Sequence, residues 1–303
     1  MNISTRNLPL ETAAAQIVKK LGGIWRPSGG MCHCPAHDDR SPSLSVRVGD
    51  RSLLFKCFAG CTVLEILRAV RRLKLDVPVD DEAVVQSFRG RDFALAERAR
   101  AIWRDAAPTI GTPAEAYLAA RGMIRSSPAL RFHPRTPLGK GRTASFRPAM
   151  IAAVHDDTGI IAIQRIFLDR DRPRLAADLT KAKLALGRPL KGAVRLYRAG
   201  ACLGLAEGVE TAQSAAMLLG IPVWATLGNE RLARITIPAG VDRLVLLPDN
   251  DPGGRRAAKL ARGAYACEGR VIETMFPWYG LNDWNDVLRR EGEKGRSRLR
   301  QAA

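Results

Sequence analysis

The sequence predicts a multi-domain α/β protein, in which a small metal-bound β module precedes a basic α+β region and a parallel sheet flanked by helices. Three observations support this prediction. Short apolar runs alternate with helical patterns between 196 and 290, as in parallel α/β sheets. Four of the six cysteines lie between positions 32 and 61, which favours a metal site over a disulfide scaffold. The 303 residues, 46% of them hydrophobic, suffice for two or three cores.

These patterns divide the chain into five segments. We expect a Cys-rich module over residues 1–75, an acidic and turn-rich linker over 76–90, and a basic α+β region over 91–195. A parallel sheet with its helices should occupy 196–290, and a basic tail that frays without a partner should occupy 291–303.

The first segment should contain two helices and two strands. Helical spacing covers 10–21, and alternating apolar residues over 43–48 and 52–56 predict the strands. Thr62 with Glu65 three positions later is a capping-box pattern, so a second helix should follow it.

The basic region should contain helices and a hairpin. A helical pattern covers 92–106, and Thr112 followed by Pro113 predicts the start of another helix. Alternating segments at 150–154 and 160–168 flank a turn sequence and predict a β-hairpin. In the last segment we expect strands at 201–206, 221–227, 244–248 and 270–275, with helices at 209–219 and 254–264.

The charge of the chain predicts its class of partner. It carries 48 Lys and Arg against 30 Asp and Glu, a net charge of +18, which is typical of proteins that neutralise phosphates. A basic surface that serves solubility is the weaker alternative. Residues 1–20 lack the apolar core of a signal peptide, and no run reaches membrane-spanning length. We therefore expect a cytoplasmic protein with a nucleic-acid partner and no membrane partner.

Two pairs of potential ligands predict a zinc site. Cys34 and His37 lie three positions apart, and Cys57 and Cys61 follow after the predicted strands. Three thiolates and an imidazole suit a closed, tetrahedral structural zinc site. The preceding pair Cys32-His33 offers rival ligands. We prefer Cys34 because its C-x-x-H spacing suits chelation, whereas Cys32 would require the chain to double back.

Acidic residues end two of the predicted strands. Glu207 follows the strand at 201–206, and Asp249 and Asp251 follow the strand at 244–248. The carboxyl ends of parallel strands meet at one edge, where open α/β sheets place their ligands. Carboxylate oxygens suit Mg²⁺, whose coordination is usually completed by water and substrate phosphates. The acids therefore predict a Mg²⁺ site that acts on nucleic acid, although the acidic loop alone would indicate an ordinary turn.

The sequence Cys34-Pro-Ala-His37-Asp-Asp-Arg-Ser-Pro-Ser-Leu-Ser, followed by Cys57-Phe-Ala-Gly-Cys61, resembles the CHC2 zinc-binding domain of bacterial and phage DNA primases. The resemblance covers about residues 24–68. It implies a module that precedes the polymerising domain and helps to engage the template and initiate primers.

The sequences Glu207-Gly208, Thr226-Leu-Gly228-Asn229 and Asp249-Asn-Asp251-Pro-Gly-Gly254 each follow a predicted strand and together resemble the Toprim domain of primases, topoisomerases and some nucleases. The resemblance covers roughly 196–290. It implies that Glu207, Asp249 and Asp251 are catalytic and hold Mg²⁺ or Mn²⁺, and Asp283 and Asp286 are further candidate ligands. Glu207 could instead serve as general base, and the sequence leaves both roles open.

The likeness to a primase core also implies basic side chains that guide template and nucleotide, although each one alone is equally consistent with a solvated surface charge. The candidates are Arg165, Lys181, Lys183, Lys191 and Arg255. We interpret four tryptophans with apolar or helical neighbours as core residues rather than base-stacking platforms. They are Trp103, Trp224, Trp278 and Trp284.

A zinc module, a basic region and a Toprim-like domain in this order resemble a compact DnaG-type DNA primase of a phage, plasmid or mobile element. We expect it to join ribonucleoside triphosphates into a short RNA primer on a single-stranded DNA template. A Toprim nuclease that uses the same acids, or a noncatalytic DNA-binding accessory protein of replication or conjugation, is the alternative. No G-x-x-x-x-G-K-[ST] sequence occurs, so a replicative helicase would be supplied in trans.

Overall fold

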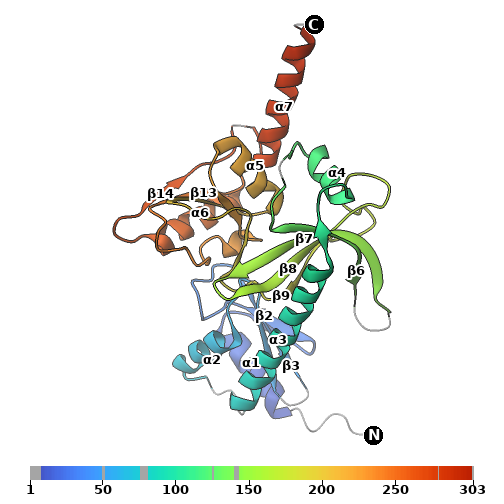
Figure 1. Cartoon of the computed structure of the whole chain (residues 1–303). Coiled ribbons are helices and arrows are strands. Elements are labelled where there is room, and N and C mark those ends of the chain that lie inside the picture. Colours follow the sequence, from blue (N-terminus) through green and yellow to red (C-terminus); the bar gives the residue numbers. More distant parts are fainter. Residues whose placement is uncertain are drawn as a thin grey trace. The chain divides into compact units, whose positions relative to one another are not determined.

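The computed structural model divides into two units, residues 1–94 and 95–303 (Figure 1). The boundary falls within helix α3 (Asp81–Asp105). In the described ranges, no helix combines the length and the apolar character needed to cross a membrane. The structure describes residues 8–49, 52–75, 81–124, 126–139, 143–278 and 280–301.

The first unit is a small antiparallel sheet with two helices, in which the two predicted strands (β3 and β4) are joined by two that were not predicted (β1 and β2). Its strands are hydrogen-bonded in the order β1-β2-β3-β4. Leu44, Val46 and Phe55 of the sheet pack in one core with Ile17 of the first helix and Ile66 of the second. The described elements are α1 (Leu8–Lys20), β1 (Ile24–Arg26), β2 (Gly29–Cys32), β3 (Leu44–Val48), β4 (Leu53–Cys57) and α2 (Val63–Arg72).

Thr62 is the N-cap of α2, as its capping-box pattern predicts. Its hydroxyl accepts a hydrogen bond from the amide of Glu65 at 3.2 Å, and the Glu65 carboxylate accepts one from the amide of Thr62 at 2.7 Å. These bonds satisfy amides that the first turn of a helix otherwise leaves unpaired. The start of α2 at Val63 is therefore fixed two residues after Cys61.

The second unit is built on one mixed sheet, which contains ten strands within the described ranges. The order is β14-β13-β11-β12-β10-β7-β6-β5, with β8 paired to β7 and β9 paired to β8. Strand β10 pairs antiparallel with both β12 and β7, so the segments expected at 91–195 and 196–290 contribute to the same sheet. After α3, the first part contains β5 (Ala107–Pro108), α4 (Pro113–Ala120), β6 (Leu130–Leu138), β7 (Ser145–Asp156), β8 (Gly159–Phe167), β9 (Lys183–Gly187) and β10 (Ala193–Arg195). The second part contains β11 (Cys202–Ala206), α5 (Val209–Leu219), β12 (Val223–Ala225), η2 (Asn229–Arg231), β13 (Arg243–Leu247), α6 (Pro252–Tyr265), β14 (Val271–Thr274) and α7 (Trp284–Gln301).

The strands of the second part run parallel, as predicted, and are covered on both faces. Leu203 and Leu205 pack in a core with Ala261 of α6, whereas Ala206 and Val245 pack in a core with Ala212 of α5. A strand covered on both faces needs apolar side chains at successive positions. This explains the unbroken apolar runs before the acidic residues.

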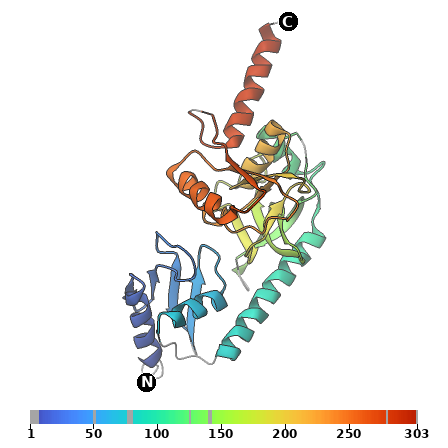
Figure 2. The same cartoon turned by 90° about the vertical axis from the view of Figure 1, so that its left-hand side faces the viewer.

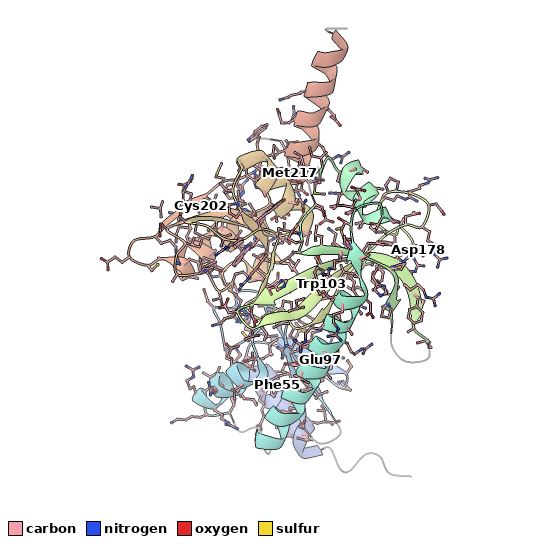
Figure 3. The ribbon with its side chains drawn as sticks, viewed as in Figure 1. Phe55, Glu97, Trp103, Asp178, Cys202 and Met217 are labelled. Atoms are coloured by element: carbon pink, nitrogen blue, oxygen red, sulfur yellow. The ribbon has the colours of Figure 1, made fainter. Side chains whose placement is uncertain are left out.

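The C-terminal part of α3 covers the antiparallel strands of the second unit. Ala99 is fully buried in a core with Ile163 of β8. Trp103 lies where the helix passes this sheet (Figure 3), with the guanidinium of Arg131 4.5 Å from the centre of its ring. The carbonyl of Trp103 accepts a 2.9 Å hydrogen bond from the same guanidinium.

Two segments differ from their predicted character. Residues 81–90 of the expected linker form the first turns of α3, where acidic residues favour a helix start, and 76–80 lie outside the described residues. Residues 291–301 of the expected fraying tail continue α7 as a helix, which extends away from the sheet of its own unit in both views (Figures 1 and 2). An exposed pair between Glu291 and Lys294, at 2.9 Å and three positions apart, supports that helix.

Candidate functional site

The acidic residues gather at the carboxyl edge of the parallel strands. Strands β11 and β13 are neighbours, and their register pairs Ala206 with Leu247, the last residue of each strand. Glu207 therefore leaves the sheet beside the segment that begins with Pro248 and Asp249. The parallel topology thus brings together two acids that are far apart in the sequence.

Glu207 and Asp249 form a coupled pair of carboxyls. Burial, together with the nearby charges of Asp249, Glu230 and Asp251, raises the pKa of Glu207 to about 7. Burial and the charges of Asp283 and Asp251 raise the pKa of Asp249 to about 6, while a hydrogen bond with Glu207 opposes that rise. The fold therefore concentrates negative charge that one proton, or a cation, would relieve.

Asp251 holds the acidic loop rather than joining the pair directly. It is the N-cap of α6, and its Oδ1 accepts a hydrogen bond from the amide of Gly254 at 2.6 Å. Gly254 is required by close packing, because a Cβ there would lie 2.1 Å from the carbonyl oxygen of Asp249. The loop and the start of α6 are thus built as one tight turn.

Asp283 and Asp286 cap α7. The Asp283 Oδ1 accepts a hydrogen bond from the amide of Asp286 at 2.8 Å, and the Asp286 Oδ2 lies 3.4 Å from the amide of Asp283. Both carboxylates still act on the acidic pair, since both contribute to raising the pKa of Asp249. The structure therefore places them near the site, with a role in the helix as well.

Two polar residues after β12 complete this edge and were not among the predicted ligands. The charge of Glu230 acts on Glu207, and the carboxylate of Glu230 lies over Gly228, where a Cβ would approach its Oε1 to 2.5 Å. Asn229 has a buried Oδ1 without a hydrogen-bond partner. Their positions follow from the same rule that placed Glu207, because β12 is also parallel to β11.

The acidic edge offers oxygen donors to a divalent metal. Asp249 Oδ1 and Asn229 Oδ1 are both buried oxygens without a hydrogen-bond partner, and the surrounding carboxylates repel one another. Oxygen donors of this kind suit Mg²⁺ or Mn²⁺. Glu207, Asp249 and Asp251 could hold such an ion together with water and phosphate oxygens.

A buried arginine fixes the loop after β12. Arg231 is 4% exposed, and its guanidinium donates hydrogen bonds of 2.6 Å to the carbonyls of Thr226, Leu190 and Gly192. Burial lowers its pKa to about 10, so it stays charged at neutral pH. Leu190 and Gly192 are the neighbours of Lys191 in the chain. Arg231 therefore fixes the backbone around that lysine to the loop after β12.

The predicted zinc ligands come together in the first unit. The ligand atoms of Cys34, His37, Cys57 and Cys61 all lie within 4.8 Å of one another, and the three cysteines are buried. Cys32 lies outside this cluster, and its Sγ donates a 3.7 Å hydrogen bond to the carbonyl of Leu44. The sequence preference for Cys34 over Cys32 therefore agrees with this geometry.

Asp39 orients the cluster and was not predicted. Its Oδ2 accepts hydrogen bonds from the amide of Cys34 at 2.6 Å and from the hydroxyl of Ser43 at 2.7 Å. The Nδ1 of His37 faces the Cys61 Sγ at 3.2 Å, and its Nε2 lies 3.7 Å from Asp39 Oδ1. A carboxylate behind a metal-binding imidazole fixes the ring in this way. The sequence feature that could have predicted this role is the position of an acidic residue two places after His37.

The cysteine cluster fits a thiolate-binding metal. Hydrogen bonds from Cys34 and Cys61 lower the pKa of Cys57, and the hydrogen bond with Cys57 raises the pKa of Cys34. The thiols therefore share protons around a small space, and a tetrahedral metal would replace those protons. These four residues form a candidate metal centre.

The predicted basic residues fall into two groups. Lys183 is bound within the protein, because its Nζ lies 2.8 Å from the buried carboxylate of Glu210, which also accepts a 2.7 Å hydrogen bond from Tyr117. Arg165 is likewise engaged, with a 2.7 Å hydrogen bond to the carbonyl of Pro137. The other three members of the predicted set, Lys181, Lys191 and Arg255, are exposed.

Comparisons with protein families place a known domain at the acidic site. Residues 202–294 match the Toprim domain, and residues 94–196 match a domain of unknown function, DUF7146. No curated protein matches the sequence. The acidic edge therefore lies within a Toprim domain, as the resemblance implies.

Several structures of DNA primases are among the solved structures to which this chain is similar. A DNA primase domain from Pseudomonas aeruginosa is 19% identical with a TM-score of 0.47, over 68% of this chain and 78% of that one. The zinc-binding and RNA polymerase domains of the Aquifex aeolicus primase are 17% identical with a TM-score of 0.45, over 97% and 85%. A DnaG primase catalytic domain solved with single-stranded DNA is 17% identical with a TM-score of 0.48, over 70% and 80%. This chain is a mixed α/β protein with a Toprim domain and a cysteine-rich module that could hold a metal.

Proposed function

We propose that this chain is a DNA primase, which joins ribonucleoside triphosphates into a short RNA primer on single-stranded DNA. The observation that carries the proposal is the coupled pair of Glu207 and Asp249 at the carboxyl edge of the Toprim sheet. The resemblance of the cysteine-rich module to the CHC2 domain favours primer synthesis over cleavage. We place this activity in the cytoplasm, in the replication of a phage, plasmid or mobile element.

The acidic residues have distinct parts in this proposal. Mg²⁺ or Mn²⁺ bound there would polarise the α-phosphate of the incoming nucleotide and stabilise the leaving pyrophosphate. Asp249 offers a ligand oxygen, Oδ1, that is free of hydrogen bonds. Glu207, with a carboxyl pKa of about 7, is able to hold a proton at neutral pH and to accept the proton of a 3′-hydroxyl. Asp251 keeps both in place through its cap of α6.

The remaining partners follow from charge. We assign the exposed Lys181, Lys191 and Arg255 to phosphates of the strand or nucleotide, and Lys183 and Arg165 to the support of the fold. A zinc ion in the cysteine cluster would have a structural part, since its four ligands leave no position open. A replicative helicase would act in trans.

Product analysis tests this proposal. The protein is incubated with single-stranded DNA, labelled ribonucleotides and Mg²⁺ or Mn²⁺, and the products are separated on a denaturing gel. Short RNA chains are expected. Shortened template instead would indicate a nuclease, and unchanged template without RNA would indicate a DNA-binding accessory protein.

A matched pair of variants ties the activity to the site. Asp249→Asn should abolish synthesis while single-stranded DNA binding persists. Asp242→Asn removes the same charge from an exposed acid at the opposite end of β13 and should leave synthesis unchanged. Primer synthesis by Asp249→Asn at the rate of the unmodified protein would show that the acidic edge is not the catalytic site.

A further inference from the structure

The loop formed by residues 275–278 and 280–282 follows β14 and lies beside the acidic loop. At one end the amide of Met275 donates a hydrogen bond of 2.9 Å to the carbonyl of Leu246. At the other end the amide of Asn250 donates one of 2.7 Å to the carbonyl of Asn282. Both ends of this loop are therefore fixed to the strand and turn that carry Asp249.

The loop presents a tryptophan to solvent. Trp278 is 49% exposed, whereas Trp224 and Trp284 are 2% and 1% exposed. The interpretation of these residues as core is confirmed for Trp224 and Trp284 and is wrong for Trp278. Met275, in the same loop, is 36% exposed, so an apolar surface lies at the rim of a strongly acidic site. An indole ring held outside the core offers a flat face to an aromatic ligand.

A guanidinium is held next to this loop. Arg255 lies in the first turn of α6, and its Nη2 donates a 2.5 Å hydrogen bond to Asn250 Oδ1. The same guanidinium lies 5.0 Å from the centre of the Phe276 ring. The side chain is exposed, so its remaining N–H groups are accessible to a phosphate. Arg255 thus has a fixed position between the acidic loop and the loop that carries Trp278.

We propose that Trp278 is a stacking platform for one base of a single-stranded nucleic acid, and that Arg255 binds an adjoining phosphate of the same strand. An exposed ring and a guanidinium, in a protein of net charge +18, are the two components by which proteins hold single strands without reading their sequence. The inference rests on the proposed function, because it places the single-stranded nucleic acid at the acidic edge. It names a contact from the loop after β14 that the acids themselves do not supply.

Tryptophan fluorescence tests the proposal without requiring primer synthesis. A short oligothymidylate is titrated into the full chain in the absence of nucleotides, and the emission is recorded. We expect quenching that Trp278→Phe abolishes, while Trp278→Ala weakens binding measured by anisotropy roughly 5- to 100-fold. ATP, titrated in the same way, should cause no comparable quenching.

Matched variants separate this contact from general loss of charge or apolar surface. Arg255→Gln should weaken binding and reduce its salt dependence, whereas Lys259→Gln, at an exposed position of the same helix, should have a smaller effect. Phe93→Ala, at a 65% exposed ring outside this loop, should bind normally. Thermal melting checks that each variant is folded.

Two results would overturn the inference. Trp278→Ala that binds the oligonucleotide as tightly as the unmodified protein would remove the platform, even if primers are made. Quenching by ATP and not by the oligonucleotide would assign the ring to a free nucleotide. Absence of primers together with Trp278-dependent quenching would leave the platform in place and refute the proposed function alone.

Discussion

The carboxyl groups of Glu207 and Asp249 share a hydrogen bond across the ends of two neighbouring parallel strands. This hydrogen bond raises the pKa of Glu207 and lowers the pKa of Asp249, as expected where Glu207 donates and Asp249 accepts. Each residue lies just beyond the last paired position of its strand. Because two like charges lie close together at this edge, the stability of the protein should depend on the protons or cations bound there. This dependence can be measured.

Replacing Glu207 by Gln should stabilise the metal-free protein and abolish its response to Mg²⁺. The raised pKa of Glu207 contributes stability that is present below about pH 4.5 and is lost as the pH rises through about 7. The melting temperature in EDTA should therefore fall from pH 5 to pH 8, and less steeply in Glu207→Gln. The gain at pH 8 should be roughly 1 kcal/mol, because the group is partly screened by solvent. Calorimetry measures both effects, and an equal rise with Mg²⁺ in variant and unmodified protein would contradict the prediction.

Two glycines of α6 should respond to alanine with opposite signs. At Gly254 a Cβ would lie 2.1 Å from the Asp249 carbonyl oxygen, so Gly254→Ala must shift the acidic loop and should cost roughly 1–3 kcal/mol. At Gly263 nothing lies within 4 Å of the added Cβ, and Gly263→Ala should stabilise the helix by about 0.5–1 kcal/mol. Chemical denaturation gives both values. Equal effects at the two positions would show that close packing does not determine the need for Gly254.

The elements that were predicted from the sequence have local causes. The apolar run before Glu207 and the capping-box pattern at Thr62 indicate their structures within a few residues, and the strand and helix that follow from them are present. The pairing of Glu207 with Asp249 was predictable as well, because parallel strands end at one edge. Contacts that depend on tertiary packing had no such signal.

Lys183 and Trp278 illustrate those limits. Whether Lys183 faces solvent or Glu210 depends on how β9 and α5 come together, and the sequence around the lysine carries no record of that. The exposure of Trp278 depends on the path of its loop, which is held by a backbone hydrogen bond from the amide of Asn250 to the carbonyl of Asn282. Because residues of almost any type can make such a bond, the sequence does not reveal it. Apolar neighbours in the sequence indicate a buried tryptophan only when the chain continues as a strand or helix.

The buried carboxylate of Glu210 should give stability a dependence on acid. Burial alone would raise its pKa, but the charge and hydrogen bond of Lys183 and the hydrogen bond of Tyr117 together lower it. Its contribution is therefore present above about pH 4.5 and is lost as the pH falls through the lowered pKa. Glu210→Gln should cost roughly 2–3 kcal/mol at pH 7, since it leaves Lys183 without its partner.

The comparison across pH tests that reasoning. The difference in unfolding free energy between Glu210→Gln and the unmodified protein should shrink as the pH is lowered from 7 to 3. Glu268→Gln, at an exposed acid, should show little difference at either pH. A Glu210→Gln deficit that stays constant with pH would mean that shape, rather than charge, makes the residue necessary.

The two buried cysteines Cys57 and Cys32 should differ in their effect on metal content. Cys57 Sγ belongs to the cluster whose ligand atoms lie within 4.8 Å of one another, so Cys57→Ala should lose the metal and unfold the first unit. Cys32 instead donates to the Leu44 carbonyl, and Cys32→Ala should keep one metal ion per chain at a cost of roughly 1 kcal/mol. Elemental analysis of the purified proteins, with zinc expected, gives the content directly. If Cys32→Ala lost the metal and Cys57→Ala kept it, Cys32 rather than Cys57 would be the ligand, because only the loss of a ligating thiol releases the ion in this way.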